Sequence, residues 1–212
     1  MKLRKILSAV LCVVCVGTVL TQAGERGEIL DPNLAEPSVL KGLPELSEEI
    51  VDAIVAGRPY LSAKQLDSVL ANSLEREQRE AVYAHLFRQI DLNNASREEI
   101  MVVPGMTSRM AHEFEEYRPY TSIEQFRREI GKYVDEEEVA RLEQYVFIPL
   151  NLNTASSEDL KTIPGMTDRM VHEFEEYRPY KSIEQFRREI GKYVDEDEVA
   201  RLESYITLEL SH

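Results

Sequence analysis

The sequence predicts an all-α fold built from three tandem units of 60 residues. Residues 91–150 and 151–210 align without a gap, and 43 of the 60 positions are identical. A third, more diverged copy lies at residues 31–90. Its matches to the second copy include Asp31, Asn33, Ala35, Pro44, Arg58, Pro59, Tyr60, Ser62 and Gln65. We therefore expect the three copies to share one arrangement of helices.

Each copy is predicted to contain four short helices. In residues 91–150, Ser96 begins the first helix, with Glu99 as its capping partner, and Pro104-Gly105 ends it near Val103. Thr107 is placed to cap the second helix, which Arg118-Pro119-Tyr120 terminates because proline resists helix.

The third helix is predicted to begin at Ser122, with Gln125 as its capping partner, and to end at Gly131. The fourth begins at Asp135, where acidic residues suit the positive end of the helix dipole. Apolar residues at helical spacing form the buried stripes of the last three helices. They are Met110, Phe114 and Tyr117, then Ile123, Phe126 and Ile130, then Val139, Leu142 and Val146.

The first 23 residues are typical of a secretory signal peptide. A basic head of Lys2, Arg4 and Lys5 precedes an apolar stretch and a small-residue exit before Gly24. The alternative is an uncleaved membrane anchor. Both cysteines, Cys12 and Cys15, lie in this segment. We expect an exported chain in a periplasm, a lumen or outside the cell, with residues 24–30 as a linker.

The charge of the chain is strongly acidic. The formal net charge is −14, and removing the three basic residues of the signal leaves −17. The three copies carry −4, −6 and −6 in chain order. This balance disfavours non-specific nucleic-acid binding, because Lys and Arg are needed to displace phosphate counterions. After the signal, no apolar stretch is long enough for a membrane span.

The junctions between copies are short and apolar. The segment at residues 147–153 lacks the Gly/Ser character of a flexible linker. We therefore expect neighbouring copies to pack against one another, since a lone 60-residue unit is marginally stable.

Three motifs of each later copy resemble a known family. Asp91-Leu-Asn-Asn-Ala-Ser96, Val103-Pro-Gly-Met106 and the stretch Tyr117 to Glu124 are similar to a tandem helix-hairpin-helix domain, as are their equivalents in 151–210. Two exported branches are similar: ComEA-type competence DNA receptors and PsbU-type lumenal proteins of photosystem II. The resemblance implies a binding function toward DNA or protein.

The resemblance also indicates candidate binding residues at the hairpins. In DNA-binding members, hairpin glycines let backbone N–H groups approach a phosphate at a helix start. The candidates are Pro104, Gly105, Met106, Thr107, Pro164, Gly165, Met166 and Thr167. The family's hairpin has two glycines. Only the first is present here, as Gly105 and Gly165, and the first copy has Glu45 at that position. In the second hairpin of residues 91–150, Tyr133 and Asp135 stand where glycines are expected, which disfavours a phosphate.

The repeated Tyr-Arg-Pro-Tyr turns have two interpretations. As a contact surface they give Tyr117, Arg118, Tyr120, Tyr177, Arg178 and Tyr180 as candidate interface residues, because Tyr and Arg are favoured at interfaces. Alternatively, the turns lock the second helix of each copy against the third. Arg127-Arg128 and Arg187-Arg188 are either a basic stripe or locally paired arginines.

Nothing in the sequence indicates catalysis. His112 and His172 lack the second histidine of a zinc-binding helix, and no nucleotide-binding or nucleophile motif is present. We expect a non-enzymatic protein without cofactor or metal. The leading hypothesis is a scaffold or accessory subunit that contacts another protein, and the alternative is a ComEA-like DNA-binding protein in DNA uptake.

Overall fold

The computed structural model describes residues 29–208 and confirms the all-α prediction. Twelve helices and four two-residue strands lie in this part of the chain. None of the described helices is long and apolar enough to cross a bilayer. The predicted signal peptide and most of the predicted linker fall outside the described residues. The division into domains stays a prediction.

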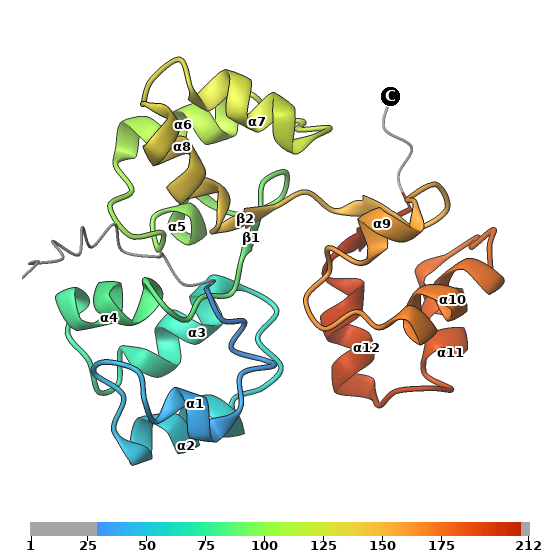
Figure 1. Cartoon of the computed structure of the whole chain (residues 1–212), viewed down its shortest axis with the longest axis horizontal. Coiled ribbons are helices and arrows are strands. Elements are labelled where there is room, and N and C mark those ends of the chain that lie inside the picture. The colour runs from blue at the N-terminus through green and yellow to red at the C-terminus, as the bar shows by residue number, and fades with distance from the viewer. Residues whose placement is uncertain (1–28, 209–212) are drawn as a thin grey trace, which may run out of the picture.

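Four helices lie at corresponding positions in each copy, which we call repeat 1 (31–90), repeat 2 (91–150) and repeat 3 (151–210) (Figure 1). Repeat 1 contains α1 (Pro37–Leu40), α2 (Glu48–Ala56), α3 (Ala63–Leu70) and α4 (Arg76–Tyr83). Repeat 2 contains α5 (Arg97–Ile100), α6 (Ser108–Glu116), α7 (Ile123–Ile130) and α8 (Glu136–Glu143). Repeat 3 contains α9 (Ser157–Leu160), α10 (Asp168–Glu176), α11 (Ile183–Ile190) and α12 (Glu196–Glu203).

The helices of repeat 2 begin where the sequence predicts. Ser96, Thr107, Ser122 and Asp135 are the N-cap residues, and each side chain accepts a hydrogen bond from the backbone N–H three residues later. The first helix is shorter than predicted, because the chain leaves helical geometry after Ile100 and continues as turns.

Glu99 was predicted to cap the start of its own helix, but its side chain contacts a different repeat in the structure. Its carboxylate accepts a hydrogen bond from the backbone N–H of Ala63, at 2.9 Å, at the start of α3 in repeat 1. Burial raises the pKa of Glu99. A residue expected to serve its own helix therefore connects two repeats.

Short parallel strands close each repeat, a feature that the sequence analysis did not predict. Strand β1 (Ile90–Asp91) pairs with β2 (Val146–Phe147), and β3 (Leu150–Asn151) pairs with β4 (Ile206–Thr207). Leu30 and Leu86 form an equivalent bridge in repeat 1. Val146 was predicted to extend the buried stripe of the fourth helix. It is buried, but as part of a strand.

Repeats 1 and 2 share one hydrophobic core, and repeat 3 has its own. Phe87 of repeat 1 meets Tyr145 of repeat 2 edge to face, with ring centroids 4.9 Å apart. Within repeat 2, Phe114 and Phe126 pack in the same manner at 5.3 Å. The predicted packing between copies is thus closest between the first two.

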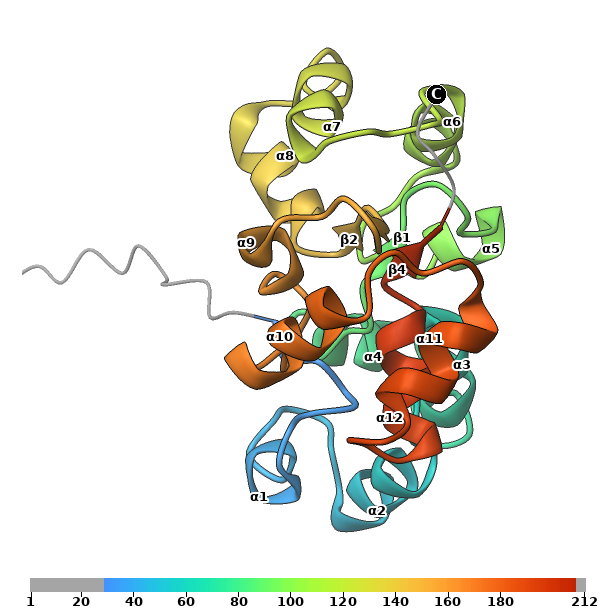
Figure 2. The same cartoon turned by 90° about the vertical axis from the view of Figure 1, so that its right-hand side faces the viewer.

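Arg88 joins repeat 3 to the other two repeats. Its side chain is fully buried, and its guanidinium carbon lies 4.2 Å from the ring centroid of Tyr205 and 5.3 Å from that of Phe147. It also donates hydrogen bonds to the Tyr60 carbonyl and to Ser204 Oγ, at 3.1 and 2.7 Å. Repeat 3 consequently lies beside repeat 1 as well as following repeat 2 (Figures 1 and 2).

Candidate functional site

The hairpin glycines adopt the backbone conformation that the motif requires. Gly105 lies between α5 and α6 with φ of 72°, and Gly165 lies between α9 and α10 with φ of 74°. This left-handed region carries no steric cost for glycine. Glu45 holds the same conformation in repeat 1, with φ of 64°, so the turn is kept there despite a side chain. The hairpin shape therefore occurs at all three positions.

Threonine and arginine side chains hold each glycine hairpin in place. Thr107 Oγ1 accepts from the Met110 N–H at 3.2 Å, and Arg141 Nη1 donates to the Pro104 carbonyl at 2.9 Å. In repeat 3, Thr167 acts in the same way on Met170, and Arg201 Nη1 donates to Pro164 at 2.8 Å. Arg141 and Arg201 were not among the predicted site residues, because each comes from the distant fourth helix of its repeat.

Two donors that an anion could use near the Gly105 hairpin, one from the backbone and one from a side chain, are already engaged. The Met110 N–H is already paired with Thr107, as described, and Arg141 is paired with Glu138 through two hydrogen bonds of 2.7 Å. A phosphate at Gly105 would therefore meet a glutamate bound to the nearest arginine, which weakens the local attraction for an anion.

The second hairpin of each later repeat ends in a carboxylate. Asp135 accepts from the Glu138 N–H at 2.9 Å, and Asp195 accepts from the Glu198 N–H at the same distance. Three acidic residues follow in the first turn of α8 and again in that of α12. These carboxylates already occupy the positive helix end, and they repel a phosphate. Aspartate thus caps the helix at the position where a DNA-binding hairpin has a glycine.

The Arg-Pro-Tyr part of each turn contacts its own repeat. Arg118 donates to the carbonyls of Leu92 and Ala95 at 2.6 and 2.8 Å, and the side chain of Tyr120 is buried. In repeat 3, Arg178 donates to Leu152 and Ala155, both at 2.8 Å, and Tyr180 is buried. These four side chains tie the second and third helices to the loop that begins the repeat.

The first tyrosine of each turn is more accessible. Tyr117 is half-buried, and its hydroxyl lies 2.8 Å from that of Tyr133. Tyr177 and Tyr193 form the same pair at 2.8 Å in repeat 3. The hydrogen bond with the partner tyrosine raises the pKa of Tyr133 and of Tyr193. Of the predicted interface residues, Tyr117 and Tyr177 therefore retain more accessible surface than the buried Tyr120 and Tyr180.

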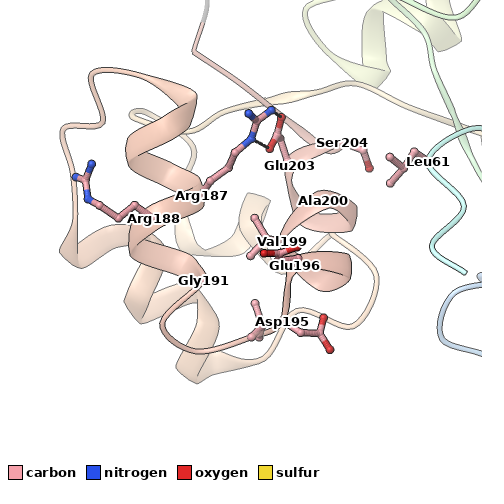
Figure 3. A pocket seen from close by; sticks show the side chains of 11 residues that line it. Leu61, Arg187, Arg188, Gly191, Asp195, Glu196, Val199, Ala200, Glu203 and Ser204 are labelled. Atoms are coloured by element: carbon pink, nitrogen blue, oxygen red, sulfur yellow. Dashed lines mark hydrogen bonds and ion pairs between the residues drawn. The ribbon is translucent and has the colours of Figure 1, made fainter.

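The paired arginines of α7 and α11 border grooves. In repeat 3 a groove of about 960 Å³ lies between α11 and α12 (Figure 3), and repeat 2 has its equivalent of about 830 Å³ between α7 and α8. Arg187 forms two hydrogen bonds of 2.6 Å with Glu203, and Arg127 bonds Glu143 in the same way. Because these arginines are paired with carboxylates, they form no uncompensated basic stripe.

The two histidines singled out in the sequence lie on exposed helix surfaces. His112 Nε2 lies 3.4 Å from Glu116 Oε2, and His172 Nε2 lies 3.5 Å from Glu176 Oε2. Within residues 29–208, no group of three or more His, Cys, Asp or Glu side chains is arranged to hold a metal ion.

The two glycine hairpins differ in their surroundings. A Cβ atom at position 165 would lie 2.8 Å from Leu34 Cδ1, so repeat 1 is in contact with this hairpin. At position 105, the only described atom that a Cβ would approach within 4 Å, apart from its chain neighbours, is Arg141 Nη2. The side chain of Arg201 is 2% exposed, whereas that of Arg141 is 24% exposed. The Gly105 hairpin is thus the more accessible of the two.

Comparison with known proteins supports the motif. Residues 87–145 match the family described as helix-hairpin-helix motif, so repeat 2 carries this motif. The chain is 31% identical over 131 residues to "Endonuclease/exonuclease/phosphatase family domain-containing protein 1" of Xenopus laevis, across 45% of this chain and 23% of that protein. The Bos taurus protein of the same name is 25% identical over 143 residues, across 47% and 25%. No solved structure gave a significant match.

The chain spans about a quarter of the length of these curated relatives. The helix-hairpin-helix motif is compatible with binding to nucleic acid or to protein. The names of the relatives do not distinguish between these two kinds of partner.

Proposed function

We propose that this chain is an exported, non-enzymatic binding protein whose helix-hairpin-helix repeats contact another protein. The observation that carries the proposal is the carboxylate at the start of α8 and of α12. Asp135 and Asp195 satisfy the helix N-terminus that a phosphate would otherwise use. The net charge of −6 on each of repeats 2 and 3 acts in the same direction.

The resemblance to PsbU-type proteins supports a scaffold or accessory role, and the signal-like N-terminus supports export. A ComEA-like role in DNA uptake is the second candidate. It is favoured by Gly105, which keeps the hairpin conformation and is open on one side. The acidic residues around that hairpin oppose it.

Affinity capture tests the protein-partner proposal. We expect the chain from Gly24 to His212, immobilised and exposed to extract of its native compartment, to retain a defined protein. Nuclease treatment of the extract should leave the amount retained unchanged, because no nucleic acid bridges the two proteins. Mass spectrometry would identify the retained protein.

A surface variant provides the matched control. Arg76→Ala removes an exposed ion pair with Glu80 on α4, which belongs to neither glycine hairpin, and should leave capture unchanged. If capture disappears after nuclease treatment, the retained proteins are bound through nucleic acid and the DNA-binding alternative gains the support.

A further inference from the structure

The groove between α7 and α8 of repeat 2 combines an apolar lining with a charged rim. Its apolar lining consists of Gly131, Val134, Val139 and Ala140. Val139 is buried at the bottom, whereas Val134 is half-buried and Ala140 is exposed. Each of the two helices has eight residues and is therefore about 12 Å long. A groove of this length is suited to about two turns of a partner helix.

Repeat 1 closes the same space with a side chain of its own. Arg79 stands at the position of Val139, and its Nε donates to Asp67 Oδ1 of α3 at 2.8 Å. The aliphatic stem and the guanidinium of this arginine thus extend from α4 to α3. This contact shows that the space between the third and fourth helices of a repeat accepts a basic side chain with an apolar stem. Repeat 2 has only a valine there, so the space stays open.

The groove of repeat 3 receives an apolar side chain from another repeat. Leu61 of repeat 1 lines it beside Ala200 and Ser204 (Figure 3). Ala200 is half-buried, whereas its counterpart Ala140 in repeat 2 is exposed. Within the described chain, the groove of repeat 2 is lined by residues of repeat 2 alone. It is therefore the more open of the two grooves.

The charges on the rim favour a basic occupant. Four carboxylates and two arginines line the groove of repeat 2, which leaves a charge of −2; they are Glu124, Asp135, Glu136, Glu143, Arg127 and Arg128. Arg127 is neutralised by its two hydrogen bonds with Glu143. Asp135 and Glu136 are exposed at the start of α8. The carboxylates that repel a phosphate there attract an ammonium or guanidinium group.

We propose that the groove between α7 and α8 of repeat 2 binds a basic amphipathic helix of a partner protein. Leucine-sized side chains of that helix lie against Val139 and Ala140, and its lysines or arginines lie beside Asp135 and Glu136. This inference rests on the proposed function and names the chemistry of the partner. A second copy of this chain is a poor occupant, because its repeats carry −4, −6 and −6.

Peptide titration followed by NMR tests the groove. The probe is a synthetic peptide of three tandem copies of Leu-Lys-Ala-Lys, whose leucines share one helix face. It is added to ¹⁵N-labelled chain from Gly24 to His212. We expect saturable shifts at the amides of Val139 and Ala140, with an apparent Kd of about 0.1–1 mM, because only a short helix is buried. Added salt should weaken the binding, since the charged contacts are exposed.

Two control peptides separate the apolar contact from the charged one. A peptide with alanine in place of each leucine should bind at least about tenfold more weakly, because it has little apolar surface for the groove. A peptide with glutamate in place of each lysine should also lose at least about tenfold, because its carboxylates face those of the rim. Equal binding of either control peptide, or no saturable shift with the parent peptide, would overturn the proposal.

A groove-filling variant keeps the test independent of folding. Repeat 1 carries Glu80 at the position of Ala140, so a long side chain is compatible with the fold there. Ala140→Arg should therefore retain a folded spectrum, while its side chain fills the groove, repels lysine and abolishes the peptide shifts. The matched control is Ala81→Arg, the same change at an exposed alanine of α4, which should leave binding unchanged. Unchanged peptide shifts in folded Ala140→Arg would contradict the proposal.

The proposed function and this inference can fail separately. A short DNA duplex that shifts the amides of Gly105 or Tyr133, when the peptide shifts none, would overturn both. Nuclease-resistant protein capture that is unchanged in Ala140→Arg, together with absent peptide shifts, would overturn the groove alone.

Discussion

Replacing Arg88 with alanine should release repeat 3 from the other repeats and lower the free energy of unfolding by about 3 kcal/mol. The buried guanidinium stacks on Tyr205 and Phe147 and donates to the Tyr60 carbonyl and Ser204 Oγ. Alanine removes all of these contacts and leaves buried acceptors without a donor. Denaturant unfolding measures the loss of stability, and small-angle X-ray scattering should show a larger radius of gyration.

The control for Arg88→Ala is Arg76→Ala, whose side chain is 70% exposed and pairs with Glu80 of the same helix. Its effect should stay within about 0.5 kcal/mol. An Arg88→Ala protein that unfolds at the same denaturant concentration as the parent, with an unchanged radius of gyration, would show that Arg88 does not hold the repeats together.

Arg118→Ala should lower the free energy of unfolding by about 2–3 kcal/mol, because it leaves the carbonyls of Leu92 and Ala95 without their charged donor. Arg118→Lys should recover only part of this loss, since one ammonium lacks the fork geometry that reaches both carbonyls. Urea unfolding of the chain from Gly24 to His212 measures both values. The result separates a structural role of the Tyr-Arg-Pro-Tyr turn from an interface role.

The comparison variant is Arg128→Ala, because Arg128 is exposed and pairs with the neighbouring Glu129. We expect almost no change in its stability. If Arg118→Ala kept full stability but lost partner capture, the turn would instead be a contact surface.

Local signals in the sequence were sufficient to predict most of the helix starts. Ser96, Thr107, Ser122 and Asp135 act as caps because each bond spans only three residues, within reach of a local pattern. Glu99 shows where this reasoning ends. Its spacing from Ser96 suits a capping box, but its carboxylate accepts a hydrogen bond from a backbone N–H of repeat 1. A local pattern carries no information about such a neighbour.

The arrangement of the repeats was less accessible from sequence. The apolar junctions predict packing between copies, yet the parallel strands and Arg88 depend on residues more than 50 positions apart. Arg88 has no counterpart in repeat 2, where Ile148 takes its position, so the comparison of repeats gives no signal for its role.

The candidate site illustrates the same limit. Gly105 and Gly165 lie in identical hairpin sequences, and their φ angles differ by 2°. Their environments differ, because repeat 1 places Leu34 beside Gly165. For this reason a substitution at Gly165 changes the packing between repeats, whereas a substitution at Gly105 acts on an open hairpin. Only the latter is a clean test of ligand binding.

Fluorescence anisotropy of a labelled DNA duplex tests the central claim that these repeats bind protein rather than nucleic acid. The chain from Gly24 to His212 would be titrated across a salt series, alongside Gly105→Glu. We predict no affinity tighter than roughly 10⁻⁴ to 10⁻⁶ M at physiological salt, with no difference between the two proteins. Submicromolar binding that weakens steeply with salt, and that a folded Gly105→Glu protein loses, would contradict the account.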